Sequence, residues 1–200
     1  GTAASVTGLS AGVTYYVLIL VVVDAANSNS TNSYSAAATI NATTPSEYTW
    51  DGSTSTDWTV ASNWTPDRSS PSSSDILNFN TGTSVSITNF TAATYGSISK
   101  LKISNNTNVT INAGSSQTLT ITSVNGIDAD LEINAGSSLI TQASRVNITL
   151  GASTTADISG TLTINSGTTY NTDAANAVTT ISGTLNCYGT VTSTASARII

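Results

Sequence analysis

Three acidic residues stand at alternate positions in the second half of the chain: Asp128, Asp130 and Glu132. Side chains alternate between the two faces of a β-strand, so this spacing would place three carboxylates on one face. Clustered carboxylates can cleave an acidic polysaccharide when a basic residue lies beside them, and Arg145 is the nearest candidate. Carboxylate oxygens are also the ligands that calcium prefers.

Two observations weigh against such chemistry. Glu132 stands between Leu131 and Ile133, whose apolar side chains should face inward, so Glu132 should point to solvent. The chain has no histidine, the commonest general base and metal ligand. It also lacks a glycine-rich phosphate loop, a Gly-x-Ser-x-Gly motif and paired cysteines. We expect no enzyme activity, no catalytic residue, no cofactor and no metal, with calcium on Asp128, Asp130 and Glu132 as a weaker alternative to a solvated turn and strand face.

Charge narrows the partners. The formal net charge is −6, and the five basic residues form no patch beyond the pair Lys100 and Lys102. Nucleic-acid binding needs clustered positive charge, so we do not expect it. Apolar runs are too short for a membrane-spanning helix. The acidic, hydroxyl-rich and lysine-poor composition is common among extracellular proteins, so we expect an extracellular or cell-surface location.

The elements that hold these residues are indicated by a repeat. The string INAGSS occurs at 111–116 and 133–138, a shift of 22, and ISGTL occurs at 158–162 and 181–185, a shift of 23. Apolar residues alternate with a period of two beside each copy, which is typical of strands. A fixed period of this length is typical of stacked coils that cover one another's apolar faces. We therefore predict an all-β chain in which residues 96–200 form a parallel β-solenoid, or β-helix, right-handed as parallel crossovers usually are.

Within this repeat, glycines recur where the chain should turn a corner: Gly114, Gly136, Gly160 and Gly183. The single cysteine, Cys187, can form no intrachain disulfide and follows Ile164 by 23 residues, in the same position of the repeat. It is predicted to be a small buried hydrophobe. The longer offset from Ile133 to Ile158 predicts a small insertion near 153–157.

Residues 1–45 have a different pattern, with strands expected at 14–23 and 34–43. The segment with Leu9, Gly12 and Tyr15 resembles the tyrosine corner of fibronectin type III modules, and the stretch ending in ATTP resembles their last strand. The resemblance covers the C-terminal half of such a module and implies a partial β-sandwich. The early strands of the module have no counterpart here.

The long strand departs from that family on its outward face. Tyr16, Leu18, Leu20 and Val22 would point outward, and all are apolar. A strand that is apolar on both faces is normally covered on both. Either the remaining part of the module or a neighbouring domain covers this face, or another copy does, which would make it a self-assembly interface.

All three tryptophans lie between these regions: Trp50, Trp58 and Trp64. The segment resembles the one that opens the β-helical region of many secreted bacterial surface and adhesin proteins, with W-x-G, D-W and N-W motifs, a proline-bounded loop and a D-x-x-x-F strand. We predict that 46–95 is a tryptophan-rich linker and cap sealing the first coil, because stacked repeats expose their core at the ends. The alternative is that the rings form a sugar-stacking platform.

These patterns predict a fragment of a larger precursor with a structural or adhesive role: a stalk, surface-layer or filament subunit. The expected partners are copies of itself or other domains of the precursor, and surface glycans are a further candidate. The alternative function is a carbohydrate-binding or polysaccharide-degrading β-helix module.

Overall fold

The computed structural model describes residues 14–19, 38–43, 46–122, 128–172, 174–193 and 197–200. The chain divides into two compact units, 1–46 and 47–200. In the first unit, β1 (Thr14–Ile19) pairs with β2 (Ala38–Thr43) in antiparallel register, with Tyr16 opposite Asn41 and Leu18 opposite Thr39. The expected corner residues Leu9 and Gly12 lie outside the described residues, as do Leu20 and Val22.

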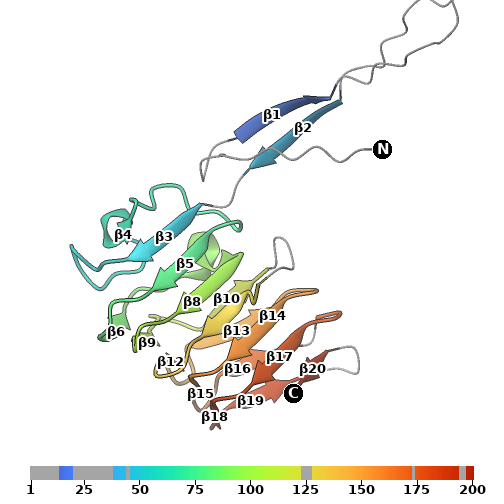
Figure 1. Cartoon of the computed structure of the whole chain (residues 1–200). Helices are drawn as coiled ribbons and strands as arrows, with labels where there is room; N and C mark the ends of the chain where they lie inside the picture. Colours follow the sequence, from blue (N-terminus) through green and yellow to red (C-terminus); the bar gives the residue numbers. More distant parts are fainter. Residues whose placement is uncertain (1–13, 20–37, 44–45, 123–127, 173, 194–196) are drawn as a thin grey trace, which may run out of the picture. The chain divides into compact units, whose positions relative to one another are not determined.

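The second unit is a parallel β-solenoid of three sheets (Figure 1). Sheet 1 has eight strands: β3 (Glu47–Trp50), β4 (Trp64–Thr65), β5 (Ile76–Phe79), β8 (Lys100–Ile103), β11 (Leu131–Ile133), β14 (Thr155–Ile158), β17 (Val178–Ile181) and β20 (Arg198–Ile199). Sheet 2 comprises β6 (Ser84–Ile87), β9 (Asn108–Ile111), β12 (Ser138–Thr141), β15 (Thr161–Ile164) and β18 (Thr184–Cys187). Sheet 3 comprises β7 (Ser97–Ile98), β10 (Gln117–Ile121), β13 (Val146–Leu150), β16 (Thr169–Asn171) and β19 (Thr190–Thr192).

Each coil contributes one strand to each sheet in turn, which confirms the predicted solenoid. The described connections are short turns, apart from a 3-10 turn, η1 (Ala61–Asn63), and one helical turn, α1 (Ala92–Tyr95). Every pairing within the three sheets is parallel except that of β3 with β4. The stacked strands begin with β3 and β5, so the predicted cap segment itself contributes strands to the coils.

The repeat is less regular than the sequence suggested. The two ISGTL copies lie one above the other, with Ile158 opposite Ile181. The two INAGSS copies do not, because Ile111 ends a strand of sheet 2 whereas Ile133 ends a strand of sheet 1. The coil between them is longer than 22 residues, since Leu101 pairs with Leu131. The same six residues therefore form two different corners, and a constant period over the whole region was a wrong prediction.

The predicted insertion near 153–157 is also misplaced. Ile133 does pair with Ile158, but Thr155 to Ile158 form the strand β14. The non-strand residues of this coil side are confined to 151–154.

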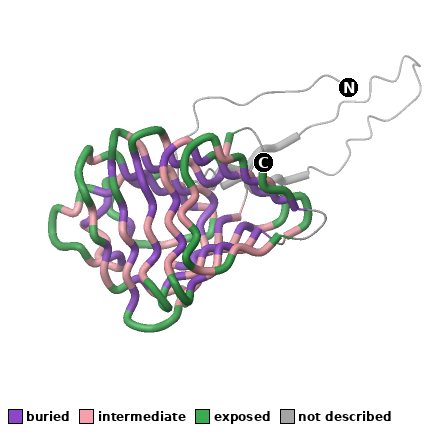
Figure 2. Tube along the Cα trace, turned by 90° about the horizontal axis from the view of Figure 1, so that it is seen from below, coloured by how far each residue is buried: buried purple, intermediate pink, exposed green. Residues whose placement is uncertain are grey.

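The core fills the inside of the coils. Inward residues of neighbouring strands stack in register, as Leu77, Leu101 and Leu131 do in sheet 1 and Val109, Leu139 and Leu162 do in sheet 2. All six are fully buried. Figure 2 shows how buried segments recur from coil to coil. Because each coil covers the next, no single coil could bury this surface alone.

Two of the corner glycines are required by close approach between coils. A Cβ on Gly160 would meet the carbonyl oxygens of Ser137 and Asn134, and one on Gly183 would meet the carbonyl oxygen of Gly160. Gly136 serves differently, because its φ of +79° favours glycine. At Gly114 a Cβ would meet nothing within 4 Å. The four glycines thus mark corners of different kinds.

Candidate functional site

The two ends of the stacked coils differ, and the first is closed by aromatic side chains. Trp50, Trp58 and Trp64 are buried, with 3%, 0% and 1% exposure. Trp64 packs edge-on against Trp50 and Trp58, with ring centroids 5.0 and 5.3 Å away, and Phe79 stacks on Trp50 at 5.7 Å. Phe90 closes the cluster against Trp58 at 5.3 Å. These rings seal the core as a cap and offer no face on which a sugar could stack.

The loop across this cap is organised by Asn63, which is fully buried. Its side-chain oxygen accepts the backbone N–H groups of Thr54 and Ser55, at 3.0 and 2.7 Å. Its amide nitrogen donates to the Asp57 carbonyl at 2.7 Å. Gly52 adopts φ +57°, which is easy for glycine. The W-x-G and N-W motifs therefore combine ring packing with a fixed loop.

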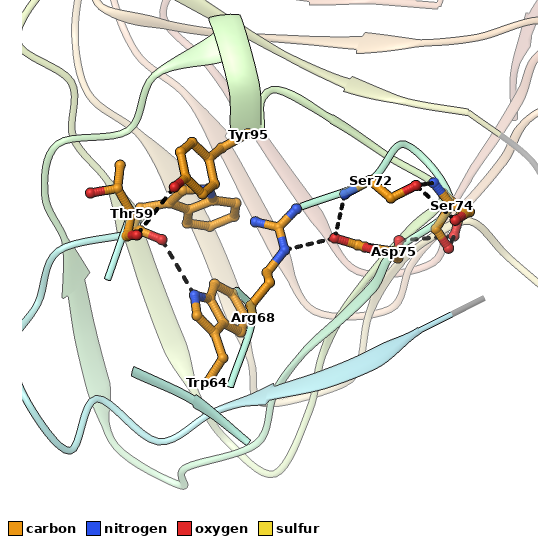
Figure 3. A network of polar contacts seen from close by, with 9 residues as sticks. Thr59, Trp64, Arg68, Ser72, Ser74, Asp75 and Tyr95 are labelled. Atoms are coloured by element: carbon orange, nitrogen blue, oxygen red, sulfur yellow. Dashed lines mark hydrogen bonds and ion pairs between the residues drawn. The ribbon is translucent and has the colours of Figure 1, made fainter. Parts of the chain in front are cut away.

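A buried ion pair joins the cap to the coils (Figure 3). Arg68 Nε donates to Asp75 Oδ2 at 2.8 Å, and the same oxygen accepts the Ser72 N–H at 2.9 Å. The guanidinium carbon lies 5.7 Å from the Trp64 ring centroid and 5.6 Å from that of Tyr95. The Arg68 Nη1 and Nη2 atoms have no hydrogen-bond partner in the described part of the chain, so the ring faces supply their main electrostatic contact.

Sequence reasoning missed this pair. Arg68 lies in a proline- and serine-rich stretch that reads as a surface loop, yet its side chain is 1% exposed. The one available signal was the D-x-x-x-F motif, which contains Asp75. The Asp75 backbone carbonyl also accepts the Ser99 N–H at 2.8 Å, so this residue links the loop to the next coil.

The three predicted carboxylates are not brought together. Asp130 is buried and accepts the Thr155 N–H at 2.8 Å, whereas Asp128 is exposed. Glu132 points outward, as expected, between Lys100 at 3.3 Å and Lys102 at 3.2 Å. Within the described ranges, no group of three or more histidine, cysteine, aspartate or glutamate side chains could hold a metal ion. The calcium alternative on Asp128, Asp130 and Glu132 was therefore wrong.

The basic partner proposed for a catalytic cluster is also elsewhere. Arg145 directly precedes β13 of sheet 3, and its Nη1 donates to the Gly114 carbonyl. Glu132 lies on sheet 1 and has lysine partners there. The carboxylates and Arg145 thus form no common site.

The second end of the stacked coils is open. Strands β18, β19 and β20 are the last in their sheets, and we call their unpaired outer side the open edge. Inward-facing Leu185 and Val191 are only half-buried there. Cys187 does lie opposite Ile164, as predicted, but it is exposed because no described strand covers it. Its predicted burial was wrong: position in the repeat sets the direction of a side chain, whereas burial also needs a following coil.

The four residues of the expected self-assembly interface belong to the first unit. Tyr16 and Leu18 lie in β1, whereas Leu20 and Val22 lie outside the described residues. The interface at these residues stays a prediction. No helix in the described part of the chain is long and apolar enough to cross a membrane.

Comparison with known proteins gave no relative: no protein-family model, no curated protein and no solved structure matches the chain.

Proposed function

We propose that this chain is a structural or adhesive component of an extracellular or cell-surface assembly: a stalk, surface-layer or filament subunit. The observation that carries the proposal is the difference between the two ends of the solenoid. One end is sealed by tryptophans, and the other presents three strand edges over half-buried apolar side chains. A molecule built in this way grows in one direction by strand addition.

The occupant that the open edge fits is a further set of parallel strands, from the same polypeptide or from another copy. Backbone N–H and C=O groups on a sheet edge are a template for pairing with another strand. Large apolar side chains are exposed beside this template: Tyr188 is 70% exposed and Ile200 is 60% exposed. Pairing would satisfy the backbone groups and cover the apolar residues in one step.

In this proposal, residues 1–45 are the C-terminal half of a fibronectin type III-like module that spaces or anchors the solenoid. The antiparallel β1–β2 pair is compatible with the last two strands of such a module. The apolar residues Tyr16, Leu18, Leu20 and Val22 are a second candidate contact for copies of the chain or for a neighbouring domain.

The alternative, a carbohydrate-binding or polysaccharide-degrading module, has weaker support. The tryptophans are buried, and the carboxylates are separated and occupied by other partners. A glycan-binding screen of the full chain would favour this alternative if a sugar were retained and if replacing an exposed residue abolished retention.

The experiment for the proposal is sedimentation velocity together with negative-stain electron microscopy of the full chain. We expect concentration-dependent association, which the double replacement Leu185→Lys and Val191→Lys abolishes at the open edge. The matched control is Thr180→Lys, on the outward side of β17, which should leave association unchanged. A second double variant, Leu18→Lys with Leu20→Lys, tests the other contact. A wild-type chain that stays monomeric at all concentrations would contradict self-association, and so would unchanged association in both double variants.

A further inference from the structure

The outer faces of the three sheets differ in charge. Every charged residue within a described strand of the solenoid belongs to sheet 1, and these residues are Glu47, Lys100, Lys102, Glu132, Asp157 and Arg198. The described strands of sheets 2 and 3 contain none. This segregation leaves two outer faces that are polar and uncharged.

Sheet 3 presents the more regular of these faces. Its outward side chains form two rows that run across the strands in register. One row is Thr118, Asn147, Thr169 and Thr190, and the other is Ser97, Thr120, Thr149, Asn171 and Thr192. The residues between the rows, such as Leu119 and Ile148, are fully buried, so the alternation between inside and outside is strict. Sheet 2 is less uniform, because Ile140 interrupts its outward polar residues.

The spacing of these rows is fixed by the backbone. Paired strands lie about 4.8 Å apart, and residues two apart along a strand are separated by about 6.6 Å. Threonine is stiff at χ1, so each threonine holds a methyl and a hydroxyl group in a defined direction. In the described structure, the hydroxyls of Thr118, Thr120 and Thr149 make no hydrogen bond to protein, so they are free to bond to water. The face is therefore a two-dimensional array of hydroxyl and methyl groups.

We infer that the outer face of sheet 3 binds crystalline water, that is, the surface of ice. Oxygen atoms in ice recur on a fixed lattice whose spacings are similar to those of the rows, and each can exchange a hydrogen bond with a hydroxyl. A charged group orders water around itself and fits no site in that lattice. The absence of charge from the described strands of sheet 3 is therefore the complementarity that this occupant requires.

A crystalline polysaccharide is the competing occupant, and the face fits it less well. Sugar rings are commonly held by exposed aromatic side chains. The two outward rows contain no aromatic residue, and the only aromatic residue in the described strands of sheet 3, Tyr170, is fully buried. Ice binding is independent of the self-association proposed above, which uses the open edge.

The test is ice-affinity partition of the full chain, combined with observation of single ice crystals in its solution. We expect the wild type to enter slowly grown ice and to shape the crystals. Thr149→Lys places a charge in the middle of sheet 3, so it should be excluded from ice. Thr149→Val keeps the shape without the hydroxyl, and it shows how much of the binding depends on that group. Circular dichroism and thermal unfolding of each variant establish that the fold is intact.

The matched control is Thr163→Lys on sheet 2, where the replaced threonine is also half-buried and outward. It should retain ice binding. Exclusion of the wild type from ice would overturn the inference, as would retention of folded Thr149→Lys or a loss with Thr163→Lys equal to that with Thr149→Lys. Capture by microcrystalline cellulose or chitin together with exclusion from ice would also overturn it in favour of the polysaccharide.

Discussion

Arg68 carries a charge into a site that otherwise consists of rings and backbone. Its side chain is 1% exposed and that of Asp75 is 2% exposed, and each is the only ionic partner of the other in the described structure. Taking both groups out of water is costly, so the pair by itself adds little net stability. Removing one member is different, because the remaining charge stays buried without a partner.

We therefore predict that Arg68→Met lowers the free energy of unfolding by about 3–5 kcal/mol. Urea unfolding followed by tryptophan fluorescence measures this directly, since Trp64 contacts the guanidinium. Lys102→Met is the control, because this ion pair is partly exposed and worth about 0–1 kcal/mol. The double variant Arg68→Met with Asp75→Leu should recover part of the loss. A loss for the double variant equal to the sum of the single losses would contradict the coupling.

A second residue-scale prediction concerns pH. Burial raises the pKa of Tyr170, and the hydrogen bond with Thr179, at 2.8 Å, opposes this only in part. Since the folded pKa lies above the unfolded value of about 10, the neutral ring favours the folded state. This stability is complete below pH 10 and is lost as pH rises towards the folded pKa. Urea midpoints at pH 8 and pH 11 should therefore differ, and the difference should shrink in Tyr170→Phe. An unchanged difference would assign it to other groups.

At the scale of elements, the corner between sheets 1 and 2 depends on contact between the backbones of successive coils. The turn containing Gly183 lies against Gly160, which in turn lies against Ser137 and Asn134. Any side chain at these positions would separate two coils that share strand pairing on both sides of the corner. The glycines are therefore part of the stacking itself.

Gly160→Ala should accordingly destabilise the solenoid by about 1–3 kcal/mol, the usual range for overpacking. Gly114→Ala is the matched control at another corner, where nothing lies within 4 Å of the added carbon. It should leave stability unchanged or raise it slightly by restricting the unfolded chain. Thermal unfolding of both variants measures the contrast, and equal losses would show that local turn conformation, rather than coil contact, decides the effect.

At the scale of the whole molecule, stability should be graded along the solenoid. Inner coils are paired on both sides, whereas β18, β19 and β20 are paired on one side and cover half-buried residues. Sheet edges with few buried contacts open more readily than core strands. The aromatic cap protects the other end from the same opening.

Native-state hydrogen exchange should show this gradient. We expect the slowest exchange in β8, β11 and β14 and the fastest solenoid-strand exchange in β19 and β20. Conditions that promote self-association should slow exchange at the open edge and leave β5 and β8 unchanged. Uniform protection of all strands would contradict the gradient and weaken the case for a free edge.

Much of the fold could be predicted because its signals are local. Alternation with a period of two identified strands such as 161–164, and it assigned Leu162 and Ile164 to the inside. The tryptophan segment was predicted as a cap from the need to close a stacked core, and its three rings are buried. The candidate carboxylate site failed because spacing within one segment does not show which partners other coils bring to it, as Thr155 and Lys102 do.

The sequence by itself determined the all-β class, the stacking and the inward side of each strand, since these depend on residues close together in the chain. Only the tertiary structure decided that Arg68 is buried, that Cys187 is exposed and that the INAGSS copies form different corners. It also decided that the threonines of sheet 3 align into rows. Each of these outcomes depends on the strand or loop that a neighbouring coil places beside the residue, and coils of unequal length set that register.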